Sequence, residues 1–116
     1  MRQFAVIGLG RFGFKVTEVL SAKGAQVLAI DKNLGLVDKA RDIVTEAVQL
    51  ECTDEEALKE SGIEGVDAAV VSIGEDVESS ILITTLLKNL GIKEIIARAG
   101  TRLHAQILKE VGATRV

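Results

Sequence analysis

Short apolar runs alternate with longer amphipathic segments along the chain, and this alternation limits the possible folds more than any other feature. The apolar runs predict strands at 3–8, 26–31, 44–50, 67–74 and 93–99. Helical apolar spacing predicts helices over 11–23, 33–42, 53–62, 76–90 and 101–111. Strands that alternate with helices form a parallel sheet covered on both faces. We therefore expect an α/β fold, a Rossmann-like doubly wound parallel sheet with strand order 3-2-1-4-5 and with residues 113–116 beginning a sixth strand.

Size and composition narrow the functional class. The 116 residues fit one compact domain, so 1–116 is expected to be a single domain. A net charge of −3 without a Lys/Arg run argues against a nucleic-acid partner. No apolar stretch approaches the roughly 20 residues that span a bilayer, and the first residues lack the long apolar region and the small-residue cleavage site of a secretory signal. We expect a cytoplasmic domain with no direct membrane insertion and, since Cys52 is the one cysteine, no internal disulfide.

A glycine-rich loop, G-x-G-x-x-G, follows the first expected strand and opens the first expected helix. In this context Gly8 permits the tight turn out of the strand, and Gly10 lets the backbone approach a pyrophosphate. Gly13 lets the helix pack closely on the strand. Free N–H groups at the helix N-terminus then face the phosphate oxygens. The loop predicts a phosphate-binding site, and a plain tight turn without a ligand is the alternative.

Asp31 stands at the end of the second expected strand, 31 − 13 = 18 residues after the last glycine. A carboxylate at this point accepts hydrogen bonds from both ribose hydroxyls of a nucleotide. It would repel a 2′-phosphate, so NADP is disfavoured, although the neighbouring Lys32 softens this effect. The alternative interpretation is that Asp31 only caps the next helix.

Arg11 is a cation at a helix N-terminus, where the helix dipole favours anions. A phosphate in the glycine loop reverses that preference, because a guanidinium forms paired hydrogen bonds with phosphate. The alternative is that the side chain points to solvent.

Apolar spacing also predicts how several side chains pack. Phe12 is expected in the core under the loop, on one stripe with Val16, Val19 and Leu20. Phe14 lies off this stripe and is expected to face a partner or another part of the chain.

The last two helices and the one over 53–62 carry their own expectations. Thr53 is predicted to be an N-cap in a capping box with Glu56. Leu103 is placed on the inner face of the last helix, with His104 opposite. The helix over 76–90 has more apolar surface than a sheet needs, which indicates contact with another subunit or with a neighbouring helix of the same domain.

Four segments together resemble the nucleotide-binding KTN lobe of RCK domains, the TrkA N-terminal or KtrA-like domain of potassium uptake systems and channels. They are "GLGRFG" (8–13), "AID" (29–31), "LKESGIEGVDAAVVSIGED" (58–76) and "IIARA" (95–99). The family often has G-D-A-T after its third strand, where this chain has Glu51, Cys52 and Thr53. The resemblance implies that the nucleotide-binding residues are Gly8, Leu9, Gly10, Arg11, Phe12, Gly13, Asp31, Lys32, Glu51, Cys52, Thr53, Ser72, Ile73, Gly74 and Arg98.

The resemblance also implies a function. Members of the family bind NAD(H), ATP or ADP as a signal rather than as a substrate, and so regulate a membrane potassium transporter or channel subunit. They form a homodimer or a higher ring, in the cytoplasm, at the inner face of the membrane through their partner. The second lobe that most members carry is expected to be absent from 1–116. No catalytic residue and no metal ligand is expected.

Two other functions stay open. The first is the cofactor domain of an NAD-dependent dehydrogenase. Such an enzyme needs an acid–base group, but the chain has one histidine, His104, no tyrosine, and no Cys/His cluster. The second is a nucleotide-binding scaffold without a link to transport.

Overall fold

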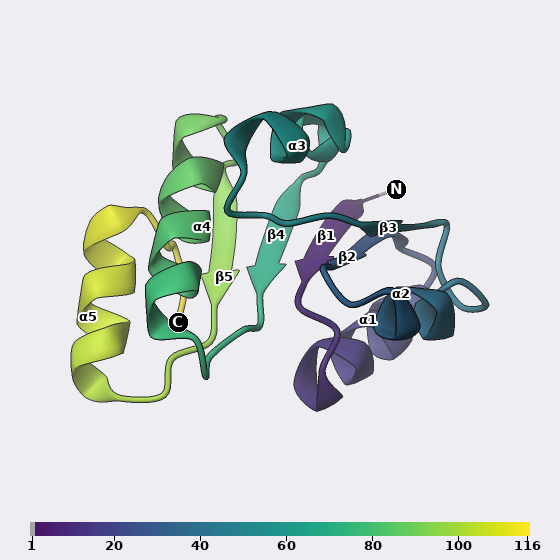
Figure 1. The fold of residues 1–116 in the computed structure, drawn as a ribbon, viewed down its shortest axis with the longest axis horizontal. Coiled ribbons are helices and arrows are strands. Elements are labelled where there is room, and N and C mark those ends of the chain that lie inside the picture. The colour runs from purple at the N-terminus through teal and green to yellow at the C-terminus, as the bar shows by residue number, and fades with distance from the viewer. Residues whose placement is uncertain (1) are drawn as a thin grey trace.

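The computed structural model describes residues 2–116 as one parallel sheet of five strands with helices on both faces (Figure 1). The order along the sheet is β3-β2-β1-β4-β5, and all neighbours pair in parallel. The predicted fold class and strand order are therefore confirmed. The strands are β1 (Gln3–Ile7), β2 (Gln26–Asp31), β3 (Glu46–Gln49), β4 (Ala68–Val71) and β5 (Glu94–Ala97).

The helices divide between the two faces of the sheet. They are α1 (Arg11–Ala22), α2 (Leu34–Ala40), α3 (Glu55–Glu60), the 3₁₀ turn η1 (Ile63–Gly65), α4 (Val77–Asn89) and α5 (Arg102–Val111). Apolar residues of α1 and α2 pack with Val6 on one face, whereas those of α3, α4 and α5 pack with Ala5 and Ile7 on the other. This alternation along β1 is the two-residue period of a strand buried on both sides.

The chain end begins to pair as the expected sixth strand would. Arg115 forms an isolated parallel bridge with Ile96, and its carbonyl accepts a hydrogen bond from Ala97 N at 2.9 Å. Residues 113–116 form no named strand.

Helix α1 is rotated relative to the predicted stripe. Gly13 and Thr17 face the sheet, while Phe12 and Val19 are 47% and 43% exposed. The prediction that Phe12 lies in the core is wrong, because the helix must turn its glycine toward the first strand: a Cβ on Gly13 would lie 1.8 Å from the Gly8 carbonyl oxygen. Phe14 is partly buried against the apolar residues around Val6, beneath the Lys39 ammonium, so another part of the chain covers it.

Two helix starts and faces also differ from expectation. The N-cap of α3 is Asp54, not Thr53, because the Asp54 carboxylate accepts from Glu56 N and Ala57 N. In α5 it is His104 that is buried, whereas Leu103 is 66% exposed. The inner position suits His104 because Ser80 Oγ lies 2.6 Å from its Nε2 and Gly100 N donates to its Nδ1 at 3.2 Å.

The apolar excess of α4 has a partner within the chain. Helix α5 lies beside it (Figure 1), and the two are joined by the His104–Ser80 hydrogen bond. Val77 and Leu82 nevertheless stay 43% and 44% exposed.

Gly10, the N-cap of α1, and Gly13, in the first turn of α1, should respond differently to substitution by alanine. Gly13→Ala forces a methyl group into the Gly8 carbonyl and should destabilise the domain by about 3 kcal/mol. Gly10→Ala is the matched control, since a Cβ there meets nothing within 4 Å, and it should cost less than about 1 kcal/mol. Urea unfolding followed by circular dichroism measures both. Equal stability losses would contradict the close approach of α1 to β1.

Candidate functional site

The candidate site lies at the carboxyl edge of the sheet, where β1 and β4 are neighbours and the chain leaves them in opposite directions. Helix α1 follows β1 onto one face, and α4 follows β4 onto the other. This reversal opens a crevice, which is where ligands bind in open α/β sheets.

The glycine loop has the backbone geometry that its sequence predicts. Gly8 has φ +95°, and a Cβ there would lie 2.5 Å from Ile73 Cγ2. Such a positive φ suits glycine. Gly10 is the N-cap of α1, and no atom lies within 4 Å of where its Cβ would be. The open space at Gly10 therefore leaves the backbone accessible to a ligand.

The N-terminus of α1 has no internal cap. No side chain accepts a hydrogen bond there, and the first turn contains no acidic residue. The first turn of a helix has backbone N–H groups without intrahelical partners. Arg11 adds a full positive charge, and its exposed guanidinium has no hydrogen-bond or ion-pair partner among residues 2–116. This end of the helix is suited to an anion.

Two side chains hold the glycine loop in place, one from the end of each strand that flanks β1. Asp31 Oδ2 accepts from Leu9 N at 2.7 Å, and its Oδ1 accepts from Asn33 N at 2.8 Å. Ser72, buried under the loop, donates to Gly8 O at 2.5 Å and lies 3.1 Å from Ile7 O. Asp31 does not cap α2, because Asn33 does so by accepting from Leu36 N.

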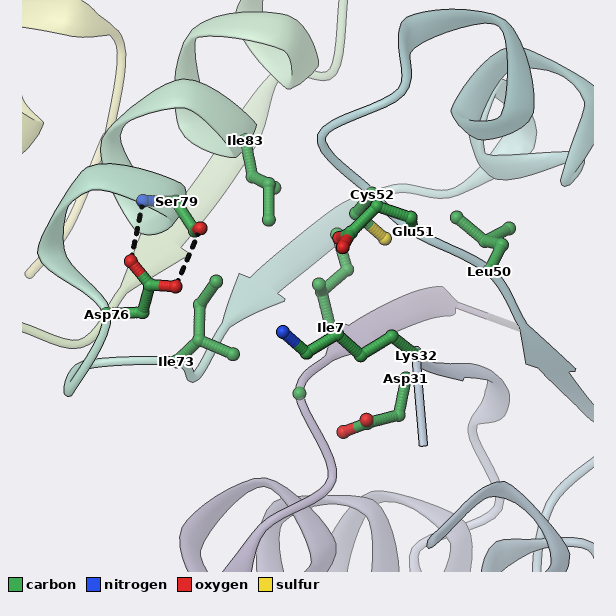
Figure 2. Close-up of a pocket in the computed structure, with 11 residues that line it drawn as sticks. Ile7, Asp31, Lys32, Leu50, Glu51, Cys52, Ile73, Asp76, Ser79 and Ile83 are labelled. Atoms are coloured by element: carbon green, nitrogen blue, oxygen red, sulfur yellow. Dashed lines mark hydrogen bonds between the residues drawn. The ribbon is translucent and has the colours of Figure 1, made fainter. Parts of the chain in front are cut away.

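A pocket of about 490 Å³, counted with its open mouth, lies between the loop, β2 and α4 (Figure 2). Its apolar wall consists of Ile7, Leu50, Ile73 and Ile83. Its polar part, drawn in Figure 2, comes from three segments, namely the end of β2, the stretch after β3 and the start of α4: Asp31, Lys32, Glu51, Cys52, Asp76 and Ser79. The Lys32 side chain extends into this space, near Ile7. Apolar walls with a few converging polar groups are typical of small-molecule sites.

Cys52 lies in the inner part of the pocket and is 4% exposed. Burial raises the pKa of its thiol to about 12, with Glu51 and Asp31 adding negative charge that favours the protonated form. The thiol is therefore neutral near pH 7 and offers an S–H group rather than a nucleophile.

Asp76 and Ser79, which were not among the residues predicted from the sequence, complete the wall on the α4 side. Asp76 caps α4 and accepts from Ser79 N at 3.1 Å and Ser79 Oγ at 2.8 Å. These hydrogen bonds, together with the Lys32 charge, lower the pKa of Asp76. The signal in the sequence was an N-cap residue just before the apolar run of the longest helix.

A second group of predicted residues lies next to this pocket. Gly74 lies against the stem of Arg98, and the Arg98 guanidinium carbon is 5.1 Å from the centroid of the Phe12 ring. Phe12 and Arg98 border a shallow depression on the β5 side of the loop.

The structure thus divides the fifteen predicted residues by position. The first pocket is lined by Gly8, Asp31, Lys32, Glu51, Cys52 and Ile73. The β5 side holds Phe12, Gly74 and Arg98. Gly10 and Arg11 border the outer surface of the loop, whereas Leu9, Gly13 and Ser72 are buried beneath it. Thr53 lines a separate groove with Asp76 and Leu82.

Residues 2–116 contain neither a membrane-spanning helix nor a metal-binding cluster of side chains. No helix in this range combines the length and the apolar character that a membrane crossing requires. The same residues contain no group of three or more His, Cys, Asp or Glu side chains that could hold a metal ion.

Three solved structures with this fold are named for nucleotide binding. The NAD(P)-binding domain of an exopolyphosphatase-related protein from Archaeoglobus fulgidus superposes with a TM-score of 0.87, at 28% identity, over 100% of this chain and 87% of that one. The GsuK channel bound to NAD gives a TM-score of 0.85 at 14% identity, covering 99% of this chain and 21% of that one. GsuK bound to ADP gives 0.80 at 15% identity, covering 99% and 30%. The two GsuK likenesses show a shared fold.

Sequence relatives identify the family. The Ktr system potassium uptake protein A of Vibrio alginolyticus is 41% identical over 115 residues, and the Ktr system potassium uptake protein C of Bacillus subtilis (strain 168) is 39% identical over 115 residues. Each alignment covers 99% of this chain and 52% of the relative, so the chain spans about half the length of these proteins. Residues 4–116 match the sequence model of the TrkA-N domain. The chain therefore belongs to the TrkA-N domain family.

Proposed function

We propose that this chain is a nucleotide-binding regulatory domain that senses NAD(H) or ATP/ADP and controls potassium transport through a membrane partner. The observation that carries the proposal is the uncapped N-terminus of α1, open at Gly10, beside a pocket that contains the Asp31 carboxylate. One end of this arrangement suits phosphate, and the other suits ribose.

The ribose would bind at Asp31. A carboxylate has about four acceptor positions, and the Asp31 side chain uses two of them for Leu9 N and Asn33 N. The remaining positions can accept from ribose hydroxyls without breaking the loop. A 2′-phosphate would face this negative charge, so NADP is disfavoured.

The adenine ring would bind against the apolar wall. Leu50 and Ile83 flank the inner part of the pocket, with Glu51 and the neutral Cys52 thiol beside them. A nucleotide base has two apolar faces and a polar edge. The apolar side chains of this wall suit the faces, and the polar groups beside them suit the edge.

The relatives support a proposal for the cellular role. The two Ktr proteins are named for potassium uptake, and the GsuK structures contain NAD or ADP. For this chain we propose the corresponding role: a homodimer or higher ring in the cytoplasm that acts on a membrane potassium transporter or channel subunit. The bound nucleotide is a signal, and its exchange alters the contacts with that partner.

The alternative, a dehydrogenase cofactor domain, is weaker because of the position of His104. This histidine is 2% exposed, and both of its ring nitrogens have partners, Ser80 Oγ and Gly100 N. It does not line the pocket. It is therefore not available as the acid–base group that hydride transfer to a small substrate requires.

Thermal unfolding in the presence of NAD⁺, NADH, NADP⁺, ATP, ADP and AMP tests the proposal. A ligand that binds the folded state raises the melting temperature, and we expect this with adenine nucleotides but least with NADP⁺. Asp31→Ala should weaken NADH and ATP binding alike, by roughly 1–3 kcal/mol. Asp67→Ala is the matched control, because Asp67 accepts from Gln3 N at 2.7 Å at the other end of the sheet and should leave affinity unchanged. No melting shift with any nucleotide would contradict the proposal.

Arg11 should contribute according to the number of phosphates. Arg11→Ala should reduce ATP affinity about tenfold or more, ADP affinity less and AMP affinity least, because a charge-assisted hydrogen bond to phosphate is lost. Added salt should shrink the difference. The control is Lys15→Ala, one turn along α1, where the ammonium already lies 3.9 Å from Glu18. Calorimetric titration measures all three ligands, and equal losses for AMP and ATP would show that Arg11 shapes the loop instead.

Cys52 reports on the adenine end without any labelled ligand. Raising a thiol pKa from 9.0 to about 12 lowers the thiolate fraction at pH 8 by about three orders of magnitude. A thiol-reactive disulfide reagent should therefore react far more slowly with the folded protein than with the chain in urea. Saturating ATP or NADH should slow it further by covering Cys52. Nucleotide that raises the melting temperature but leaves this rate unchanged would place the base elsewhere.

A further inference from the structure

The guanidinium of Arg98 lies at the carboxyl end of β5 and has no hydrogen-bond or ion-pair partner among residues 2–116. Its stem crosses Gly74 so closely that a Cβ on that glycine would lie 3.3 Å from Arg98 Cγ and 3.4 Å from Cδ. Its head group lies over the Phe12 ring, with Cζ 5.1 Å from the centroid. Contacts with carbon atoms therefore hold the cation, while its five N–H donors stay free.

Two other arginines, Arg2 and Arg41, are held by carboxylates. Arg2 also lies over an aromatic ring, that of Phe4 at 5.0 Å, but its guanidinium pairs with Glu94 at 3.1 Å. Arg41 pairs with Asp38 at 2.9 Å. An aromatic face orients a guanidinium without occupying its hydrogen-bonding edge, whereas a carboxylate occupies that edge. The arrangement at Arg98 keeps the donors available for a ligand.

Phe12 is in the right place for this task because of the rotation of α1. Gly13 faces the sheet, so the preceding side chain projects from the first turn toward β5 and stays 47% exposed. Its ring lies beside the uncapped helix N-terminus, where phosphate is expected. The Phe12 ring therefore lies outside the core and packs against the Arg98 guanidinium instead.

We propose that Phe12 is a positioning residue that holds the Arg98 guanidinium at the phosphate end of the pocket, so that Arg98 binds the distal phosphate of a nucleoside diphosphate, triphosphate or dinucleotide. This inference rests on the proposed nucleotide-binding function. On this proposal, the single phosphate of a monophosphate is held by the glycine loop and makes no contact with Arg98. The Phe12–Arg98 pair therefore favours ligands with two or more phosphates over AMP.

The stack is tested first in the free protein. The ring current of Phe12 should shift the NMR signals of the Arg98 δ and ε protons upfield. Phe12→Leu should abolish this shift, and Phe12→Tyr should retain it. Unshifted Arg98 signals in the unaltered protein would overturn the proposal before any ligand is added.

Calorimetric titrations with ADP and AMP then test the role. Phe12→Leu should reduce ADP affinity about two- to fivefold, the range for an exposed cation–π contact, and should leave AMP affinity unchanged. Arg98→Met should reduce ADP affinity at least as much, and the double variant should be no weaker than Arg98→Met alone. Phe12→Tyr, which keeps an aromatic ring at this position, should retain the ADP affinity of the unaltered protein. Phe14→Leu is the matched control in the same helix, because its ring lies under Lys39, and it should bind ADP like the unaltered protein.

The contrary results are distinct. Equal losses for ADP and AMP would show that Phe12 shapes the loop, and additive losses in the double variant would show that the two residues act separately. Loss of ADP affinity in Phe12→Tyr would indicate that Phe12 acts by its packing and not by stacking on the Arg98 guanidinium. Each of these overturns the positioning role while nucleotide binding stands. If the unaltered protein binds none of ADP, ATP, NAD⁺ and NADH, the proposed function fails, and this inference fails with it.

Discussion

The close contact between Gly13 and the Gly8 carbonyl is the constraint on which the site depends. It leaves no room for a Cβ, so α1 must turn this residue toward β1. That choice fixes the rotation of the whole helix. It places the uncapped N-terminus at the crevice, buries Thr17, and directs Phe12 outward toward Arg98.

The loop itself is held by polar contacts rather than by apolar packing alone. Asp31 accepts from Leu9 N on one side, and Ser72 donates to Gly8 O on the other. The ends of three neighbouring strands, β2, β1 and β4, are thereby joined before any ligand arrives. A preformed loop of this kind reduces the conformational entropy that binding would otherwise cost.

The fold and part of the site could be predicted from the sequence. The alternating pattern predicted the sheet and its order, since parallel strands with right-handed crossovers leave few topologies. The spacing of Gly13 and Asp31 predicted that Asp31 binds the ribose of the nucleotide held by the loop. The structure adds that Asp31 itself accepts a hydrogen bond from Leu9 N in this loop. These features depend on local pattern and on backbone rules.

The errors arose where tertiary packing overrides local pattern. Phe12 has the apolar character of a core residue, yet the packing of its neighbour Gly13 turns it outward. His104 is polar, yet it is buried because Ser80 of the neighbouring helix α4 and Gly100, just before α5, satisfy its nitrogens. Asp76 entered the pocket through the relative placement of α4 and β2, which no short segment of sequence specifies.

The central claim is that a nucleotide lies between the glycine loop and Asp31, at the carboxyl edge of the sheet. Amide ¹H–¹⁵N chemical shifts recorded during titration with ADP or NAD⁺ test this most directly. The account predicts that the largest changes fall on Gly8, Leu9, Gly10 and Arg11 and at the end of β2, with little change at Asp67 and Gly24 on the opposite edge. Saturable changes confined to that opposite edge, or to the outer surface of α5, would contradict it.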